Sequence, residues 1–207
     1  MTAAAPDGPA ALAAAIGARA GGRGRFITAI AGPPGAGKST LAAGVVAALG
    51  PGARVVPMDG FHYDNAVLAR RGLLPRKGAP ETFDLDGFAV LLRRLRAGGT
   101  AAIPVFDRAA DLSRAAADVV AAEDRLLVVE GNYLLLDESG WRDLAPLFDL
   151  TVAIAVPEAE LERRLIRRWR DHGLDAAAAA ARTQANDLPN AQRVVAGSRA
   201  ADLVLSQ

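Results

Sequence analysis

Short apolar runs recur along the chain and alternate with longer segments in which apolar residues recur every three or four positions. A run that is apolar throughout is typical of a parallel strand covered on both faces, whereas the longer period is typical of a helix with one buried side. Strands that alternate with helices in this way predict an α/β fold with a parallel sheet. The predicted strands span residues 25–31, 54–58, 126–129, 151–156 and 202–205.

Glycine and proline mark the boundaries of the predicted helices. Gly50 closes the first helical pattern, Pro157 stands where a later helix would begin, and Gly173 follows its last turn. Both residue types are common at these helix positions. The predicted helices span residues 39–49, 88–95, 157–173 and 175–185, and residues 186–190 are expected to form a polar loop.

The length of 207 residues fits one fairly large domain better than two. Residues 1–24 are rich in Ala, Gly, Pro and Arg, and Asp7 and Pro9 can start a helix that ends before Gly21. We therefore expect a short helix and a flexible link in residues 1–24, followed by a single domain in residues 25–207.

Composition excludes several classes of protein. The 24 basic and 23 acidic residues give a net charge of +1, which provides no basic field for unspecific binding of nucleic acid. The absence of cysteine excludes disulfides, thiolate zinc sites and thiol nucleophiles. No apolar run approaches the ~18 residues of a membrane span, and no signal peptide pattern opens the chain. We expect a cytoplasmic protein without nucleic-acid or membrane partners. The sequence leaves open whether the protein forms a homodimer.

Residues 32–39 read G-P-P-G-A-G-K-S and lie between a predicted strand and a predicted helix. In this context the glycines let successive backbone N–H groups surround a phosphate, and the following helix directs its positive end at the same place. Lys38 can reach the β- and γ-phosphates and Ser39 can bind Mg²⁺. The alternative is a chance glycine turn. The predicted nucleotide-binding residues are Gly32, Pro33, Pro34, Gly35, Ala36, Gly37, Lys38, Ser39 and Thr40.

Glu130 ends an apolar strand that we expect beside this phosphate loop. Its carboxylate can hold Mg²⁺ or position a nucleophile, and the alternative is a cap for the following loop. The N-K-x-D motif of GTPases is absent, because Gly37 and Arg76 precede the only two lysines, Lys38 and Lys77. The G-x-G-x-x-G dinucleotide motif is absent as well.

Asp59 follows the second predicted strand directly. The carboxyl ends of neighbouring strands in a doubly wound sheet border one crevice, so Asp59 should face the phosphate loop. A carboxylate at that place can accept the proton of an attacking hydroxyl.

Several motifs around Asp59 resemble one family. They are D-G-F at residues 59–61, R-G-L at 71–73, R-K-G-A-P-E-T-F-D at 76–84 and V-V-E-G-N-Y at 128–133. These segments resemble the phosphoribulokinase, uridine kinase and type I pantothenate kinase family over residues 25–205. A closer likeness is to a bacterial group described as fructose transport system kinases.

The resemblance implies a doubly wound five-stranded parallel sheet with helices on both faces and an arginine-rich lid. It also implies ATP with Mg²⁺ and transfer to a hydroxyl group of a small molecule. Carried over by position, Asp59 would be the catalytic base, Asp84 would bind acceptor hydroxyls, and Lys77 would lie near them.

Two departures from the family bear on the acceptor. Uridine kinases carry P-V-Y-D followed closely by a base-reading His, whereas residues 104–108 read P-V-F-D-R with no His nearby. Pantothenate kinases are longer and add aromatic segments. We therefore prefer a sugar or other polyol, with fructose first, because carboxylates such as Asp59, Asp84 and Asp107 can each accept two adjacent hydroxyls. The candidate substrate-binding residues are Asp59, His62, Lys77, Asp84, Asp107 and Arg108.

Structural alternatives accompany these candidates. His62 can be a wall residue, and Asp84 can cap the helix that contains Phe88. Trp141 and Trp169 are expected to pack in the core. The polar side chains of Asn186, Asp187 and Asn190 either line the adenine end of the site or make turns.

The predicted helix after Pro157 carries five arginines, of which Arg164, Arg167 and Arg168 fall on one side by their spacing. Similar kinases place arginines on a mobile lid, where they neutralise the phosphoryl group in transit. Arg164 and Arg167 match that spacing best, and the alternative is a solvated helix face.

These features together predict an ATP-dependent kinase with Lys38, Asp59, Arg164 and Arg167 as catalytic residues, and with Ser39 and Glu130 at Mg²⁺. A nucleoside or pantothenate-like kinase is the nearest alternative. An ATP-binding regulatory module that phosphorylates no metabolite is the alternative from another class.

Overall fold

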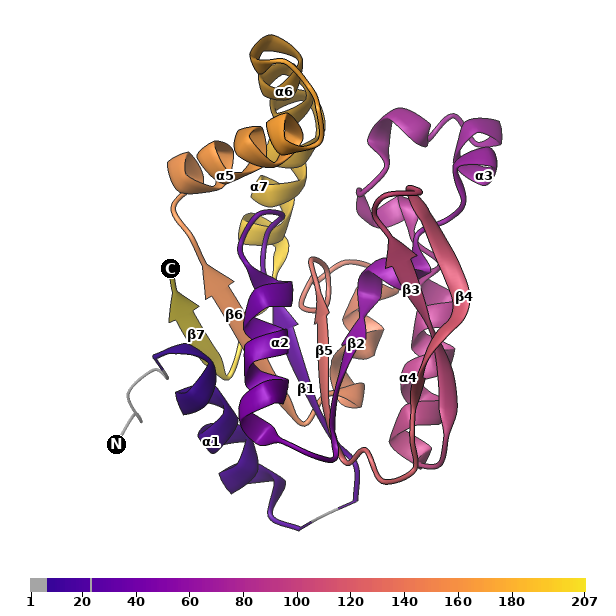
Figure 1. Cartoon of the computed structure of the whole chain (residues 1–207), viewed down its shortest axis with the longest axis vertical. Helices are drawn as coiled ribbons and strands as arrows, with labels where there is room; N and C mark the ends of the chain where they lie inside the picture. The colour runs from indigo at the N-terminus through magenta and orange to yellow at the C-terminus, as the bar shows by residue number, and fades with distance from the viewer. Residues whose placement is uncertain (1–6, 23) are drawn as a thin grey trace.

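The computed structural model describes residues 7–22 and 24–207, and its centre is a five-stranded sheet (Figure 1). The strand order is β2-β5-β1-β6-β7, and every neighbouring pair is parallel. This confirms the predicted doubly wound α/β fold. The strands are β1 (Phe26–Ala31), β2 (Ala53–Pro57), β5 (Leu126–Gly131), β6 (Leu150–Ala155) and β7 (Leu203–Ser206).

The central strand β1 is buried over its whole length, and its side chains serve two separate hydrophobic layers. Because successive side chains of a strand point to opposite faces, Ile27 and Ala29 join one layer while Phe26 and Ile30 join the other. Helices therefore cover both faces of the sheet.

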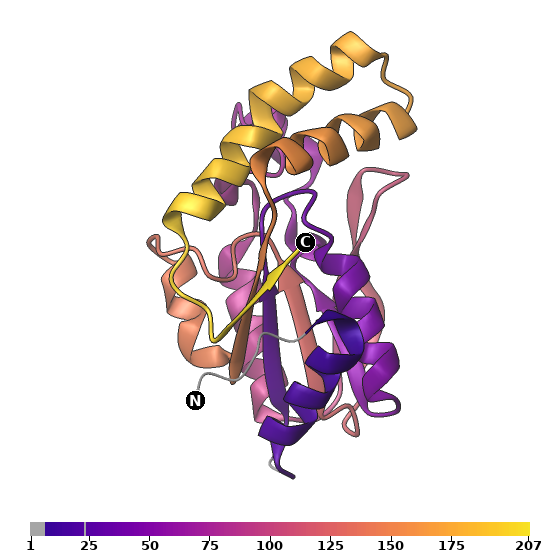
Figure 2. The same cartoon turned by 90° about the vertical axis from the view of Figure 1, so that its left-hand side faces the viewer.

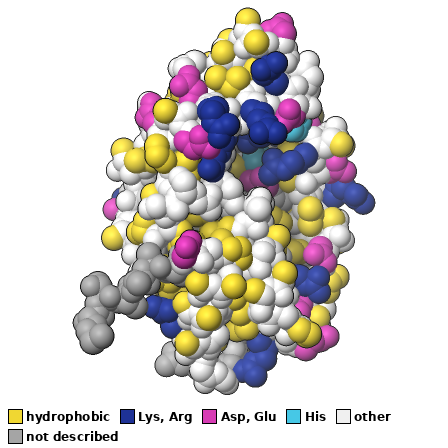
Figure 3. Space-filling model, turned by 60° about the vertical axis from the view of Figure 1, so that its left-hand side comes forward, with side chains coloured by type: hydrophobic (Ala, Val, Ile, Leu, Met, Phe, Trp, Pro, Cys, Tyr) yellow, Lys and Arg dark blue, Asp and Glu magenta, His cyan; other side chains and the backbone are white. Residues whose placement is uncertain are grey.

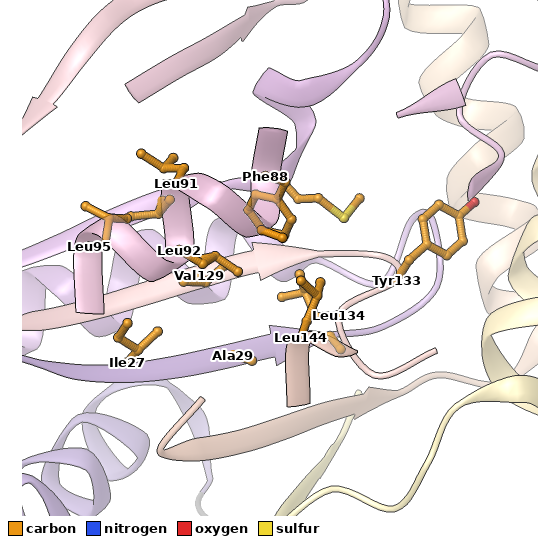
Figure 4. Close-up of a cluster of buried hydrophobic side chains, with 14 of the residues drawn as sticks. Ile27, Ala29, Phe88, Leu91, Leu92, Leu95, Val129, Tyr133, Leu134 and Leu144 are labelled. Atoms are coloured by element: carbon orange, nitrogen blue, oxygen red, sulfur yellow. The ribbon is translucent and has the colours of Figure 1, made fainter. Parts of the chain in front are cut away.

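The first layer lies between the sheet and α4 (Leu85–Ala97), with the 3₁₀ helix η4 (Trp141–Leu147) beside it (Figure 4). Phe88, Leu92 and Leu95 on α4 repeat at helical spacing and are buried. Trp141 is buried in the same layer, as expected for a packing residue.

Four helices contribute to the layer on the opposite side. They are α1 (Gly8–Ala20), α2 (Lys38–Leu49), α5 (Glu158–Asp171) and α7 (Leu188–Gly197). Of these, α1 and α2 cover the sheet face, while α5 and α7 join from the carboxyl ends of the strands (Figure 1 and Figure 2). The helix expected near the N-terminus is present as α1, whose Leu12 and Ile16 are buried in this layer. The link expected after it includes residue 23, which lies outside the described residues.

A β-hairpin of strands β3 (Ala101–Asp107) and β4 (Leu112–Val120) stands outside the sheet and was not among the predicted strands. Most residues of β4 are exposed, so no buried face imposes an apolar pattern. Short helices lead from β2 to α4, namely η1 (Met58–Phe61), α3 (Asn65–Arg70), η2 (Leu74–Arg76) and η3 (Pro80–Thr82).

The predicted polar loop at residues 186–190 is wrong, because this segment is helical. The Ala-rich helix is α6 (Ala176–Arg182), and it continues through the π-helical turn η5 (Thr183–Asp187) into α7. Leu188, Ala191 and Val194 supply a buried helical face that the polar residues obscure in the sequence. The helices α5, α6 and α7, which we call the arm, lie above the carboxyl ends of the strands (Figure 2).

The register of the parallel strands brings three loops together. Glu130 on β5 pairs with Ile30 on β1 and with Pro57 on β2. Strand β1 ends one residue after Ile30, and β2 ends at Pro57 itself. The loop after β1 and the turn after β2 therefore begin at the level of Glu130 in the sheet. This is the edge where doubly wound folds bind their ligands.

Within residues 7–22 and 24–207, no helix is both long enough and apolar enough to span a membrane.

Leu92→Ala should lower the free energy of unfolding by about 2–5 kcal/mol, because it leaves a cavity in the layer under α4. Val90→Ala on the exposed side of the same helix is the control and should change it by less than ~0.5 kcal/mol. Urea unfolding of both variants checks this, and equal losses would contradict the layer assignment.

Candidate active site

The predicted phosphate loop connects β1 to α2 and ends at Lys38, the first residue of that helix. Gly35 and Gly37 have φ of +81° and +83°, a region that favours glycine. The first turn of α2 contains no acidic residue, so its free N–H groups and positive dipole end remain available for an anion. Residues 32–40 thus have the backbone geometry of the phosphate cradle that the sequence predicts.

Lys38 is buried within this loop, with 8% of its surface exposed, and its Nζ donates to the backbone oxygen of Pro33 at 3.0 Å. Burial lowers the pKa of Lys38 to about 8, although the nearby carboxylates of Glu130 and Asp59 oppose this effect. The ammonium group of Lys38 is therefore poorly solvated, and the negative charge of a bound phosphate would stabilise it.

Ser39 and Glu130 offer oxygen ligands for a cation. The Ser39 hydroxyl donates to Glu130 Oε1 at 3.1 Å, and burial raises the pKa of Glu130, with the charge of Asp59 adding to the increase. The described residues contain no group of three or more His, Cys, Asp or Glu placed to enclose a metal. One hydroxyl and one carboxylate fit Mg²⁺, which keeps several waters and takes further oxygens from substrate phosphates.

Asp59 lies in η1, directly after β2. Gly60 beside it approaches the hairpin so closely that an added Cβ would lie 2.4 Å from the backbone oxygen of Pro104. The same hairpin brings in Arg108, whose Nη2 donates to Asp59 Oδ2 at 2.9 Å. The hairpin therefore sets the position of Asp59 from outside the sheet.

His62 follows η1 and packs between two aromatic rings. Its ring centroid lies 4.0 Å from that of Phe83 and 4.8 Å from that of Phe106. The carbonyl of Asp59 lies 2.8 Å from Nδ1, and because a carbonyl only accepts, Nδ1 carries the proton and Nε2 is left as an acceptor. Burial lowers the pKa of His62, so the ring is neutral at pH 7.

Two cavities meet at Asp59. One of about 340 Å³ lies over the phosphate loop and includes Lys38, Ser39 and Glu130, and we call it the phosphate cavity. The other, of about 160 Å³, includes His62 and Lys77, and we call it the inner cavity. The residues that line both are Pro34, Asp59, Arg108, Asn132, Arg168 and His172.

Lys77 lines the inner cavity and is held there by the hairpin and by α3. Its Nζ lies 2.8 Å from Asp111 Oδ1 and donates to Asn65 Oδ1 at 2.7 Å. Asn65 also donates to Asp111 Oδ2, so both oxygens of Asp111 are occupied.

Asp84 and Asp107, expected to bind acceptor hydroxyls, line neither cavity. Asp84 accepts from the backbone N–H of Gly87 at 3.0 Å and caps α4, which is the structural alternative for this residue. Asp107 accepts from two backbone N–H groups in the hairpin turn. Both carboxylates are thus used locally, and the expectation that they bind substrate is corrected.

Arg164 and Arg168 reach the cavities from the arm, and Arg167 does not. Arg164 lines the phosphate cavity, and Arg168 lines both cavities. Arg167 lines neither and is 76% exposed in its side chain, and its one ion-pair partner among the described residues is Asp171, at 3.9 Å. This corrects the pairing of Arg164 with Arg167.

The reason lies in the helix geometry. Arg168 comes three residues after Leu165 and seven after Leu161, and these two leucines form the buried side of α5. Residues at these spacings share one helix face, whereas Arg167 is turned away from Arg168 by about 100°. Figure 3 shows basic side chains gathered on this upper part of the molecule, which includes Arg163, Arg164, Arg167 and Arg168.

Asp187 of the π-helical turn η5 and Asn190 of α7 line the inner cavity, whereas the sequence left them either at the adenine end of the site or in turns. Asp187 accepts from Arg168 Nη2 at 3.2 Å and from the indole nitrogen of Trp169. Asn190 lines the same cavity, and Asn186 donates to the backbone oxygen of Lys77 at 2.9 Å. Asp187 and Asn190 therefore lie beside Lys77 and outside the phosphate cavity, and Trp169 is a cavity residue rather than a core residue.

Arg182, His172, Asn132 and Asp111 also line the inner cavity and were not predicted. Asn132 lies within the V-V-E-G-N-Y motif, from which no role for it was predicted, and no period or motif in the sequence marks the other three. A π-helical turn is often found at functional sites, but it has no sequence signature of its own.

A phosphate loop after the central strand, with a carboxylate at the end of the neighbouring strand, defines a P-loop nucleotide-binding protein of the phosphotransferase type. The model of the phosphoribulokinase / uridine kinase family matches residues 27–206, and the chain belongs to this family. It is thus a member of a kinase family.

Individual proteins agree with this assignment. The chain is 38% identical over 186 residues to YggC, an uncharacterized protein of Escherichia coli, and the match covers 87% of this chain and 77% of YggC. It is 34% identical over 202 residues to a Schizosaccharomyces pombe protein provisionally named a uridine kinase, covering 88% and 83% of the two chains.

A solved structure is similar over nearly the whole chain. It is the crystal structure of a Silicibacter sp. TM1040 protein that is provisionally named a fructose transport system kinase. The TM-score is 0.92 at 49% identity, and the similarity covers 96% of this chain and 99% of the other.

Arg168→Ala should lower kinase turnover by tenfold or more, since it removes a cation that lines both cavities. Arg167→Ala should stay within twofold of the unchanged protein. Rates of ADP formation in both variants check this, and a larger loss from Arg167→Ala would restore the original pairing.

Proposed function

We propose that the protein transfers the γ-phosphoryl group of ATP to a hydroxyl group of a small molecule bound in the inner cavity. The nucleotide phosphates would occupy the phosphate cavity, and the two ligands would meet at Asp59.

The observation that carries this proposal is which oxygens of the three carboxylates of the inner cavity already have a hydrogen-bond or ion-pair partner. Asp111 and Asp187 have both oxygens engaged by neighbouring side chains. Asp59 has one oxygen bonded to Arg108, and no hydrogen bond from the described residues reaches Oδ1. Asp59 is therefore the carboxylate that has an oxygen available for a substrate hydroxyl, and it lies where the two cavities join.

The transfer then follows directly. The acceptor hydroxyl donates to Asp59 Oδ1, and its oxygen forms the new bond to the γ-phosphorus as the bond to the β-phosphate oxygen breaks. The hydroxyl proton passes to Asp59 and ADP leaves. In such reactions the protein acts mainly by positioning and by stabilising charge.

The charges of the site suit these steps. Lys38 would contact the β- and γ-phosphates, and Arg164 and Arg168 would stabilise the charge that spreads over the transferred group. Mg²⁺, held by Ser39 and Glu130, would neutralise phosphate charge when bound. Arg108, bonded to Asp59 Oδ2, would hold Asp59 oriented until the hydroxyl arrives.

For the acceptor we propose a sugar or another polyol, and fructose is the first compound to test. Asn132, Asn190 and His62 Nε2 offer hydrogen-bonding groups beside Asp59. The rings of the cavity are already covered, since Trp169 lies under the guanidinium groups of Arg168 and Arg182. This arrangement favours hydroxyl groups over a stacked base. The provisional name of the Silicibacter relative supports the choice of fructose.

A panel of sugars, polyols, nucleosides and pantothenate in an assay of ADP formation tests the proposal, with the mass of each product confirmed. We expect sugars or polyols to stimulate turnover. Stimulation by nucleosides alone would reject the sugar acceptor, and no stimulation by any compound would favour a regulatory nucleotide-binding module.

Lys38→Ala should abolish most of the turnover, because the ammonium group at the phosphates is lost. The fold should persist, since the side chain ends in the phosphate cavity and not in a hydrophobic layer. Turnover and circular dichroism check this together. A folded variant with near-normal turnover would contradict the assignment.

Asp59→Asn should reduce kcat by ~10² or more and leave ATP affinity nearly unchanged, as expected for loss of a general base. Asp86→Asn, which lies on the exposed side of α4, is the control with the same change in charge. Steady-state rates and ATP titrations measure both. An equal loss of ATP binding would instead make Asp59 a nucleotide or metal residue.

A further inference from the structure

The inner cavity contains one more cation than it contains carboxylates. Its charged lining, apart from the two histidines, consists of Lys77, Arg108, Arg168 and Arg182 against Asp59, Asp111 and Asp187. His62 adds no charge to this balance, because burial lowers its pKa and leaves the ring neutral at pH 7.

Three of the cations are paired within the cavity. Arg108 lies 2.9 Å from Asp59, and Lys77 lies 2.8 Å from Asp111. Arg168 completes the set at 3.2 Å from Asp187. Each carboxylate is thus neutralised by its own basic residue.

Arg182 is the fourth cation of the inner cavity, and none of the cavity's three carboxylates is paired with it. Among the described residues, no carboxylate lies within ion-pair distance of it, and its buried Nε has no hydrogen-bond partner. A buried donor without an acceptor costs free energy, so native proteins seldom retain one without a reason.

The position of Arg182 is nevertheless fixed. Its guanidinium carbon lies 4.7 Å from the centroid of the Trp169 ring, and the indole N–H of Trp169 is bonded to Asp187. A cation over an aromatic face is stabilised there without the use of its N–H groups. Arg182 is therefore held in place with donors to spare.

Arg182 lines the inner cavity and not the phosphate cavity, whereas Arg108 and Arg168 line both. Its charge is thus placed for the acceptor and not for the nucleotide.

We propose that the phosphate acceptor carries a negatively charged group, a carboxylate or a phosphate, which Arg182 binds while an acceptor hydroxyl lies at Asp59. The inference rests on the proposed function and makes its acceptor more specific. Sugar acids and sugar phosphates fit the cavity better than neutral sugars. Both anions present the planar or multiple oxygens that a guanidinium group binds in pairs.

Matched acceptors test this, namely glucose against gluconate, glycerol against glycerate, and fructose against fructose 6-phosphate. We expect the charged member of at least one pair to have a kcat/KM tenfold or more above that of its neutral member. The pairs with gluconate and glycerate test a carboxylate, and the pair with fructose 6-phosphate tests a phosphate, so the experiment distinguishes the two sources of negative charge. Equal values within every pair would overturn the inference and leave the proposed kinase function intact.

Variants of Arg182 add a test that separates acceptor from nucleotide. Arg182→Gln should raise the KM for the charged acceptor about 10- to 100-fold, the range for a hydrogen bond to a charged group, with the KM for ATP unchanged. Arg182→Lys should recover part of the loss. Arg170→Gln, an exposed arginine on α5 that lines neither cavity, is the matched control and should have no effect. An equal rise in the KM for ATP would overturn the inference.

A binding measurement keeps the inference testable without turnover. Trp141 and Trp169 are the only tryptophans, so Trp141→Phe leaves Trp169, beneath Arg182, as a single fluorescent reporter. Gluconate, glycerate or fructose 6-phosphate should change this fluorescence at concentrations at which Arg182→Gln shows no change. Such binding without ADP formation would retain the anion site but overturn its assignment to the phosphate acceptor, and no Arg182-dependent binding would overturn the site itself.

Discussion

The parallel register of β2, β5 and β1 is the constraint on which the site depends. Pairing of Glu130 with both Ile30 and Pro57 makes three chain segments leave the sheet at the same level. Lys38, Glu130 and Asp59 are far apart in sequence, yet their charges influence one another because of this alignment. A slip of one residue in either pairing would turn the affected strand over and separate the carboxylates from the phosphate loop.

The arm depends on this arrangement in turn. Leu161 and Leu165 pack into the layer beneath α5, and an added Cβ on Gly35 would lie 3.2 Å from Leu165. The phosphate loop and the arm therefore touch through an apolar contact, which turns the leucine side of α5, together with Arg168, toward the site. Asn186 adds a polar contact to the backbone of Lys77. The arm is attached to both sides of the site, at the phosphate loop and at the acceptor segment.

Sequence reasoning succeeded where local chemistry and register determine the structure. The phosphate loop, the five parallel strands and the placement of Asp59 near that loop all follow from motifs and apolar runs. It failed for Asp84 and Asp107, because a carboxylate that caps a helix or turn looks the same in sequence as one that binds a ligand. It selected Arg167 because charge spacing was considered without the buried Leu161 and Leu165, which determine the side of α5 that faces the site. Asp187 lies in a π-helical turn and Arg182 ends the helix before it, and no sequence pattern marks either residue as part of the site.

The β3–β4 hairpin stands outside the five-stranded sheet, yet its turn contributes Arg108 and Asp111 to the wall of the inner cavity. The remaining charged groups of that wall come largely from the arm, which is a separate addition at the other end of the chain. Neither element takes part in the sheet that builds the phosphate loop. Changes of acceptor during evolution can therefore accumulate in these two segments while the phosphate loop, Glu130 and Asp59 stay intact, so that one sheet scaffold serves enzymes with different substrates.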